Sequence, residues 1–114
     1  MATIYKICPA DLWDAAIAAG IFRGSPVDLA DGFIHFSAAG QVAETAAKHF
    51  AGASGLVLAA FDDAALRPPV RYEPSRGGAL FPHLYGPLDP HLALWVRPLP
   101  LGADGRHLLP DLAP

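Results

Sequence analysis

The feature that most constrains the fold is a run of apolar residues near the middle of the chain, residues 56–61 (LVLAAF). The run has the length of a β-strand, and Gly55 and Asp62 mark its two ends. A continuous apolar strand, in contrast to an alternating one, is typical of a strand that is buried on both faces. The sequence therefore predicts a sheet whose centre is residues 56–61.

Further short stretches are rich in strand-forming residues and are bounded by proline or glycine. They lie at residues 4–7, 33–36, 70–73 and 92–96. From residue 99 onward, proline and glycine recur every few positions, so residues 99–114 are expected to form a surface strand followed by a frayed tail.

Two amphipathic helices are predicted in the first half of the chain. The first spans residues 9–19, because proline is accepted in a first helical turn and Gly20 supplies a stop. The second spans residues 38–50, with Ser37 as its N-cap and an apolar residue at every fourth position. Residues 21–28 are expected to form the loop that follows the first helix.

Two helices followed by several strands, with Pro/Gly loops between them, favour the α+β class over an alternating doubly wound sheet. A chain of 114 residues and 12.0 kDa is long enough for one core, so we expect residues 1–114 to form a single domain.

Charge and hydropathy limit the partners that such a chain would have. The net charge is −3, with 8 Lys and Arg against 11 Asp and Glu, which disfavours tracking of a DNA or RNA backbone. Proline and glycine interrupt the uncharged run at residues 77–88, so no membrane span is expected. The first residues do not have the pattern of a secretory signal peptide, and we therefore expect a cytoplasmic protein.

Two histidine-bearing motifs hold most of the functional information, residues 31–37 (DGFIHFS) and residues 81–87 (FPHLYGP). Each motif puts proton-handling side chains next to turn residues and between large hydrophobic ones, a combination that core packing alone would not select. We expect the two motifs to form two walls of one small-molecule site.

Within each motif, two polar residues are two positions apart, and such residues point to the same face of a strand. His35 and Ser37 would project together where the second helix begins, and a helix N-terminus favours anions. His83 could move a proton near neutral pH, while Tyr85 donates a hydrogen bond or stacks on an aromatic ring. The motifs therefore predict a pocket that orients a ligand.

The same residues also have structural interpretations. Ser37 could only cap the helix while His35 bonds to a backbone carbonyl, and residues 81–87 could be a packed corner. Glu73 could orient a hydroxyl or stabilise a developing positive charge, or it could form an exposed ion pair with Arg71. These alternatives stay open at the level of the sequence.

The spacing of the histidines does not predict a metal site, because no His-x-x-x-His pair is present. A nucleophilic Ser37 is weakly supported, since the chain has no Gly-x-Ser-x-Gly motif. Cys8 precedes a helix start and is interpreted either as a small buried residue or as a thiol with a lowered pKa. The remaining histidines are expected to be surface residues outside the site: His49, His91 and His107.

Taken together, these motifs resemble the domain-of-unknown-function family 952, and the resemblance covers the chain from about Ile4 to about Pro100. It implies a small bacterial cytoplasmic protein whose fold is similar to that of ADP-ribosyltransferases, with two small sheets that face each other across an NAD-sized cleft. The family itself has no established activity. The motifs that carry the resemblance are residues 4–7, Trp13, residues 31–37, Gln41, residues 73–78 and residues 81–86.

The resemblance also implies roles for individual residues. The first strand of the ADP-ribosyltransferase fold usually presents His or Arg to the nicotinamide end of NAD, and the matching position here is Lys6, which departs from that pattern. Glu73 is the candidate for the late acidic residue that such transferases need. In type, His35, Arg76 and His83 resemble the residues that RNA 2′-phosphotransferases of this fold place around a phosphate.

The favoured hypothesis is a cleft for NAD, ADP-ribose or another nucleotide or phosphorylated metabolite, in an enzyme or a degenerate relative of one. An RNA end is a less favoured ligand. Two alternatives are a non-catalytic binding module and a structural or partner-binding domain, in which exposed apolar residues such as Trp95 or Leu99 would meet another chain. The candidate catalytic residues are His35, His83 and Glu73, and the candidate binding residues are Lys6, Ser37, Arg76 and Tyr85.

Overall fold

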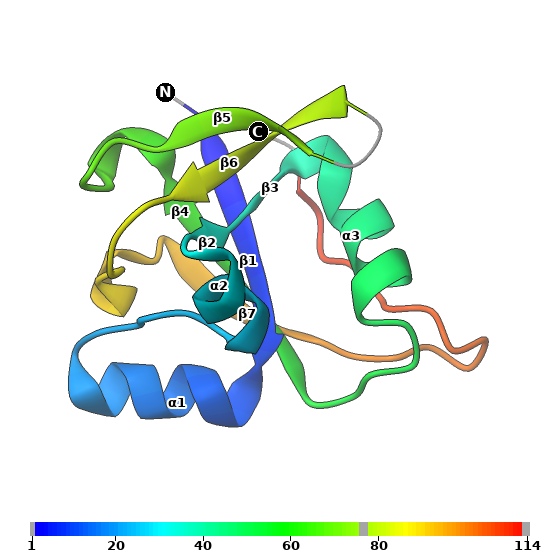
Figure 1. The fold of residues 1–114 in the computed structure, drawn as a ribbon. Helices are drawn as coiled ribbons and strands as arrows, with labels where there is room; N and C mark the ends of the chain where they lie inside the picture. Colours follow the sequence, from blue (N-terminus) through cyan, green and yellow to red (C-terminus); the bar gives the residue numbers. More distant parts are fainter. Residues whose placement is uncertain (1, 76–77, 113–114) are drawn as a thin grey trace.

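The protein is built from two antiparallel sheets, and one continuous segment of the chain contributes a strand to each of them (Figure 1). The computed structural model describes residues 2–75 and 78–112. The strands are β1 (Thr3–Pro9), β2 (Ile34–His35), β3 (Ser37–Ala38), β4 (Leu56–Asp62), β5 (Arg71–Ser75), β6 (Ala79–Leu84) and β7 (Trp95–Leu99). In the described part, the larger sheet has the order β3-β1-β4-β7 and the smaller one has the order β2-β6-β5. The predicted α+β class is confirmed.

The predicted buried strand is β4, and it lies inside the larger sheet between β1 and β7. Its alternate residues enter two different clusters of buried side chains. Ala59 and Phe61 belong to the first cluster, whereas Leu58 and Ala60 belong to the second on the other face of the sheet. Because both faces of β4 are covered, the strand has no polar face and reads as a continuous apolar run.

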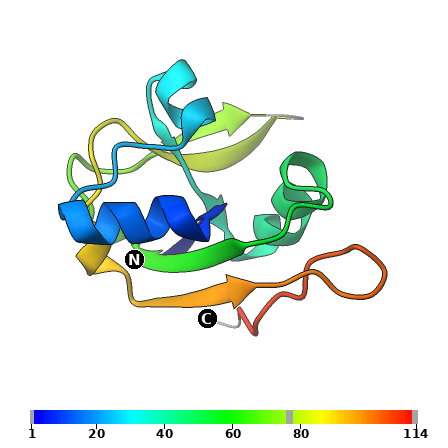
Figure 2. The same cartoon turned by 90° about the horizontal axis from the view of Figure 1, so that it is seen from below.

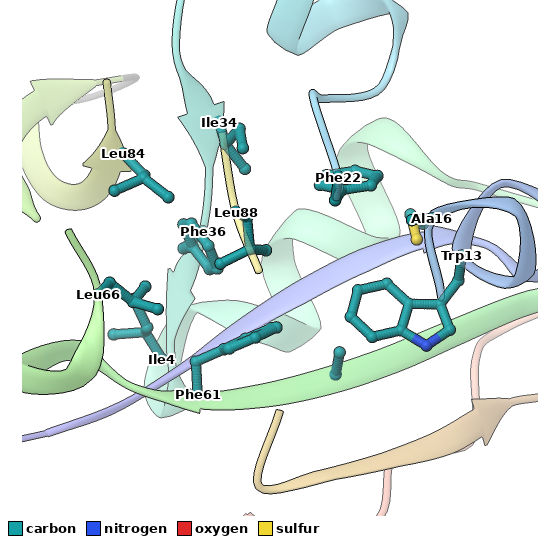
Figure 3. Close-up of a cluster of buried hydrophobic side chains, with 12 residues drawn as sticks. Ile4, Trp13, Ala16, Phe22, Ile34, Phe36, Phe61, Leu66, Leu84 and Leu88 are labelled. Carbon is teal, nitrogen blue, oxygen red and sulfur yellow. The ribbon is translucent and has the colours of Figure 1, made fainter. Parts of the chain in front are cut away.

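The first cluster fills the space between the larger sheet, the smaller sheet and α1 (Ala10–Ala19), as Figure 3 shows. Trp13 of the helix lies near Phe22 and Phe61, with ring centroids 6.2 and 6.1 Å apart. From the smaller sheet, Ile34 and Leu84 point into the same cluster. This packing attaches the smaller sheet to the larger one.

The second cluster lies under α3 (Val42–His49), and the views in Figures 1 and 2 place this helix away from α1. The helix buries Val42 and Ala46, and Phe50 packs beside them, as the spacing of four residues predicted. Strand β1 contributes Tyr5 and Ile7 to this cluster. The two clusters therefore cover opposite faces of β1, because its residues alternate between them.

The first predicted helix is confirmed, and it ends where Gly20 takes a left-handed conformation with φ of 76°. The expected loop at residues 21–28 is wrong, because a third helix, α2 (Pro26–Asp31), begins inside it. Ser25, Pro26 and Asp28 form a capping box with proline in the first turn, a pattern that favours a helix start.

The second predicted helix starts later than expected, with a 3₁₀ turn at Ala39–Gln41 followed by α3. Ser37 does not cap it, because Ser37 is paired with Tyr5 in β3. Its hydroxyl instead lies 3.0 Å from the Thr45 hydroxyl. The side chain of Gln41 performs the capping, since its Oε1 accepts a hydrogen bond from Ala38 N at 2.9 Å.

At the end of the chain, the predicted strand at residues 92–96 lies three positions further on, because Pro90–Leu92 forms a 3₁₀ turn. Leu99 is fully buried, so the hypothesis that it is an exposed contact for another chain is wrong. The segment after β7 returns to the body of the protein, where His107 Nε2 donates to the Ala53 carbonyl at 2.8 Å and Leu112 packs on the second cluster.

One feature of the topology positions the site. The chain leaves the smaller sheet after His35, passes through the buried Phe36, and joins the larger sheet at Ser37. Because β3 is two residues long, it pairs only with Ile4 and Tyr5 of β1. Among the described strands, the rest of β1 has a partner on the β4 side alone, which leaves an open edge that starts at Lys6.

Candidate functional site

A cavity of about 410 Å³ lies beside this open edge of β1. Its lining comes from both sheets and from the two helices α2 and α3. Among the described residues, the predicted site residues that line it are Lys6 of β1, His35 of β2, Ser37 of β3 and His83 of β6. Since they come from three separate parts of the sequence, only the folded chain brings them together.

The most buried charged group next to the cavity is the Asp28 carboxylate of α2, whose side chain is 1% exposed. Lys6 Nζ donates to it, at 3.1 Å from Oδ1 and 2.8 Å from Oδ2. Ser25 donates from its backbone N at 2.8 Å and from its hydroxyl at 3.0 Å. His35 donates from its backbone N at 3.1 Å, and its ring Nδ1 lies 2.6 Å from Oδ1. One carboxylate therefore joins β1, α2 and β2.

These contacts fix the charge of Asp28. Burial alone would raise the pKa of its carboxyl, but the hydrogen bond from His35 and the ammonium of Lys6 outweigh burial and hold that pKa well below its usual range. Asp28 is therefore ionised at neutral pH. A buried ion pair of this kind stabilises the fold only as long as each charge keeps its partners.

The ring of His35 has a carboxylate on each of its nitrogens. Nδ1 faces Asp28, and Nε2 lies 2.9 Å from Oδ2 of Asp31, the last residue of α2. A neutral imidazole carries one N–H, so both contacts are hydrogen bonds only in the imidazolium, which donates from both nitrogens. Each ring nitrogen of His35 thus faces a carboxylate oxygen.

His83 has a different environment, because one carboxylate contacts its ring. Its Nδ1 donates to Glu73 Oε1 at 2.8 Å, and the Tyr85 hydroxyl donates to the same oxygen at 2.7 Å. The bonds from His83 and Tyr85 lower the pKa of Glu73, and the bond to Glu73 raises the pKa of Tyr85. With Nδ1 as the donor, a neutral His83 keeps the lone pair on Nε2, the tautomer that a general base requires.

Phe33 holds the two imidazole rings in place. Its ring centroid lies 4.5 Å from that of His35 and 4.1 Å from that of His83, and the Tyr85 ring follows at 5.1 Å. Arg71 lies over the other aromatic ring of this group, with Cζ 4.6 Å from the Tyr85 centroid. Such stacking restricts ring rotation, so the direction of each ring nitrogen is set before any ligand binds.

The two histidines are direct partners in the pairing of β2 with β6. Directly paired residues of antiparallel strands project from the same face of the sheet, and the two ring centroids are 5.5 Å apart. The histidine motifs therefore form one wall of the cavity instead of the two that were expected. The rest of the lining includes Tyr5 and Ile7 of the larger sheet and Thr45 of α3.

Of the other predicted site residues, Glu73 and Tyr85 lie behind the wall and act on it through His83. Glu73 does not form only an exposed ion pair with Arg71, the alternative interpretation, because it accepts hydrogen bonds from His83 and Tyr85. Arg76 lies outside the described residues. Lys6 lines the cavity, but its ammonium is bound to Asp28.

Sequence reasoning gave no role to three residues near the wall, Asp28, Asp31 and Phe33, although the last two lie within the first histidine motif. The capping-box pattern at Ser25 could have identified Asp28, although the helix that follows has six residues and is too short for a periodic pattern. His49 was expected to lie outside the site, but it lines the cavity.

Cys8 is not a reactive group of this site, because its side chain is fully buried. Burial raises the pKa of its thiol to about 11. The interpretation as a thiol with a lowered pKa is therefore wrong. Within residues 2–75 and 78–112, no three His, Cys, Asp or Glu side chains are grouped in a way that could hold a metal ion.

The fold and the cavity define a small α+β protein in which two antiparallel sheets enclose a pocket with paired histidines. None of the helices in the described chain is long and apolar enough to cross a membrane. Residues 7–96 match the family described as "Protein of unknown function (DUF952)", and the chain belongs to this family.

Three solved structures of one protein, CC0527 from Caulobacter crescentus, are similar to this chain. Its crystal structure is 52% identical, with 93% of each chain covered and a TM-score of 0.88. A crystal structure of a double mutant is 50% identical at the same coverage and TM-score. The solution NMR structure is 53% identical, covers 93% of this chain and 91% of that one, and has a TM-score of 0.83. No curated protein matches the chain.

Proposed function

We propose that the cavity binds a nucleotide or another phosphorylated ligand of the NAD or ADP-ribose type, in a cytoplasmic protein. The observation that carries this proposal is the meeting of His35, His83 and Ser37 in one cavity. Hydrogen-bonding groups that converge in a mostly apolar pocket are the usual composition of a small-molecule site.

The size and lining of the cavity agree with such a ligand. Small-molecule pockets measure roughly 300–1,000 Å³, and the volume of about 410 Å³ lies at the lower end of that range. One nucleotide unit suits this volume better than a complete dinucleotide does, so the second half of NAD would extend into solvent. Phe36, Phe50 and Phe81 offer apolar surface for a ring, while the histidine wall and Ser37 offer donors and acceptors for the sugar and phosphate.

The proposal includes the ADP-ribosyltransferase-like fold expected from the family resemblance, and the position of the cavity between two antiparallel sheets supports it. The assignment of Lys6 changes with the structure. Because Asp28 neutralises its ammonium, Lys6 would hold α2 against the cavity and would not provide an unpaired charge for phosphate.

Thermal unfolding with and without ligand tests the proposal, because a ligand that binds only the folded state raises Tm by mass action. We would titrate the wild-type protein with NAD, ADP-ribose, nicotinamide and inorganic phosphate, and confirm each shift by calorimetry. At about 100 times Kd, the expected stabilisation is roughly 2.7 kcal/mol.

The matched variant is His83→Asn, in which the amide nitrogen can still donate to Glu73 while the outer ring nitrogen is lost. A shift in the wild type that is weaker in this variant supports a ligand at the histidine wall. An equal shift in both proteins, or no shift with any of the four compounds, contradicts the proposal.

A further inference from the structure

The two histidines of the wall differ in how many of their ring nitrogens contact a carboxylate. His35 has a carboxylate on both nitrogens and is set up as a proton donor. His83 has its carboxylate on Nδ1 and is set up as a proton acceptor at Nε2. Two titratable groups with different environments in one site are the usual arrangement of an acid and a base that work on one substrate.

We infer that the cavity hydrolyses the phosphodiester of a ribonucleoside 2′,3′-cyclic phosphate, with His83 as the general base and His35 as the general acid. The inference rests on the proposed function, because it needs a nucleotide in the same cavity. It goes beyond that function by naming a reaction and a substrate class.

The reaction needs water as its co-reactant. His83 Nε2 takes a proton from the water, and the water oxygen forms a bond to phosphorus. The bond from phosphorus to the ribose 2′-oxygen breaks, and His35 gives its Nε2 proton to that oxygen. The product is the nucleoside 3′-phosphate, and solvent afterwards returns the proton to His35 and takes one from His83.

The contacts of His35 and Asp31 are compatible with these steps. The leaving oxygen must take the place of Asp31 at Nε2, and the Asp31 side chain is 47% exposed, so it can turn toward solvent. Asp28 stays on Nδ1 throughout and holds the neutral ring in the correct tautomer after the proton has left.

Water is a better nucleophile here than a side chain. Several of the small nucleophilic groups near the wall are already bonded or buried. The Ser37 hydroxyl is bonded to Thr45 and has no histidine partner in this geometry, while the Cys8 thiol is buried. A direct attack by water, assisted by one base and one acid, therefore fits the groups present.

The charge of the wall favours a phosphodiester over a phosphomonoester. With His35 protonated, as the reaction requires, the described side chains at the wall and bonded behind it carry three positive charges (Lys6, Arg71 and His35) and three negative ones (Asp28, Asp31 and Glu73). A wall without net charge suits the single charge of a phosphodiester better than the double charge of a phosphomonoester. It also allows the product to leave.

The test uses the full chain and the four ribonucleoside 2′,3′-cyclic phosphates, with products separated by chromatography. We expect conversion to nucleoside 3′-phosphate and, in H₂¹⁸O, one ¹⁸O atom in the product phosphate. His35→Asn and His83→Asn each keep a donor toward their carboxylate but lack the outer ring nitrogen, so each should lower kcat by about 100-fold or more. His91→Asn is the matched control, because His91 lies outside the cavity, and its kcat should equal that of the wild type.

The outcomes separate this inference from the proposed function. If the protein binds NAD or ADP-ribose at the wall but converts none of the four cyclic phosphates, the reaction is wrong and the binding site stands. If neither binding nor conversion occurs, both proposals fail. Conversion that survives in both folded variants would show that the two histidines are not the acid and the base.

Discussion

The two histidine–carboxylate pairs of the wall differ in how deeply their acids are buried. His35 and His83 are cross-strand partners, and each contacts a carboxylate oxygen through Nδ1, at 2.6 and 2.8 Å. The Asp28 side chain is 1% exposed and is also bound by Lys6, whereas the Glu73 side chain is 33% exposed. The acid is therefore in the core in one pair and near the surface in the other, whereas the histidines are reversed, with the His83 side chain 5% exposed and that of His35 25% exposed.

The difference shows why the same residue types need different interpretations. Without its donors, a buried carboxylate loses far more free energy than one that water can solvate. The Asp28 pair is therefore required for the fold to assemble around the cavity. Loss of the Glu73 pair should change the free energy of unfolding less than loss of the Asp28 pair. Because Glu73 orients the ring of His83, substitutions at Glu73 are the better way to look for effects on function alone.

The largest expected effect comes from removing the two acids separately. Asp28→Ala leaves the buried ammonium of Lys6 unpaired and should lower the free energy of unfolding by about 3–5 kcal/mol. Glu73→Ala should lower the urea midpoint much less, because the carboxylate is partly exposed, even though the variant removes the Nδ1 partner of the buried His83. Equal losses of stability in the two variants would remove the distinction between a buried acid and a partly exposed one.

A smaller effect is expected from the histidines themselves. His35→Ala takes a donor from a buried carboxylate and should cost about 1–3 kcal/mol. His35→Asn restores an amide donor near the position of Nδ1 and should recover most of that loss. The corresponding Ala and Asn variants of His83 should differ less from each other in urea unfolding. If the Ala and Asn variants differed more in stability at His83 than at His35, the expected order of the two positions would be wrong.

The smallest effect is a dependence on pH in the acid range. The pKa of Asp28 is lower in the folded than in the unfolded chain, so its stabilisation is complete above the unfolded value of about 4 and is lost as pH falls through the folded value. Of the groups that face it, Lys6 stays charged throughout this range, and His35 and Asp31 are the others that must be considered.

Urea unfolding of the wild type and of Asp28→Asn should therefore give a difference in stability that shrinks as the pH falls below about 4. Asp14→Asn, an exposed substitution on α1, provides the control and should show no such trend. A difference between wild type and Asp28→Asn that grows as the pH falls would contradict the assigned charge of Asp28.

The elements that the sequence predicts well are those with strong local signals. The run at residues 56–61 and the helix that ends at Gly20 are found where their apolar pattern and stop residue indicate. Helix α2 was missed because six residues show no periodicity, although its capping box is visible. The order of strands and the pairing of residues far apart in the chain are set by tertiary contacts and could not be read locally.

The sequence predicted only part of the site, because the rest of the site also depends on tertiary contacts. The two-residue spacing of His35 and Ser37 predicts that both side chains project together, and both line the cavity. The stretch that contains them reads as one strand, however, and nothing local shows that the chain changes sheets at Phe36. That His35 lies opposite His83 is a matter of register between β2 and β6, which no single segment encodes.

The Asp28 carboxylate also has a consequence for assembly. Its donors come from β1, from the start of α2 and from β2, so it is satisfied only after three separate segments have arrived. A chain with one of them missing would have to bury a charge with too few donors, and it would keep that carboxylate in water instead. Asp28 therefore has all its donors only in a chain whose two sheets have already come together, and only such a chain has a complete cavity wall.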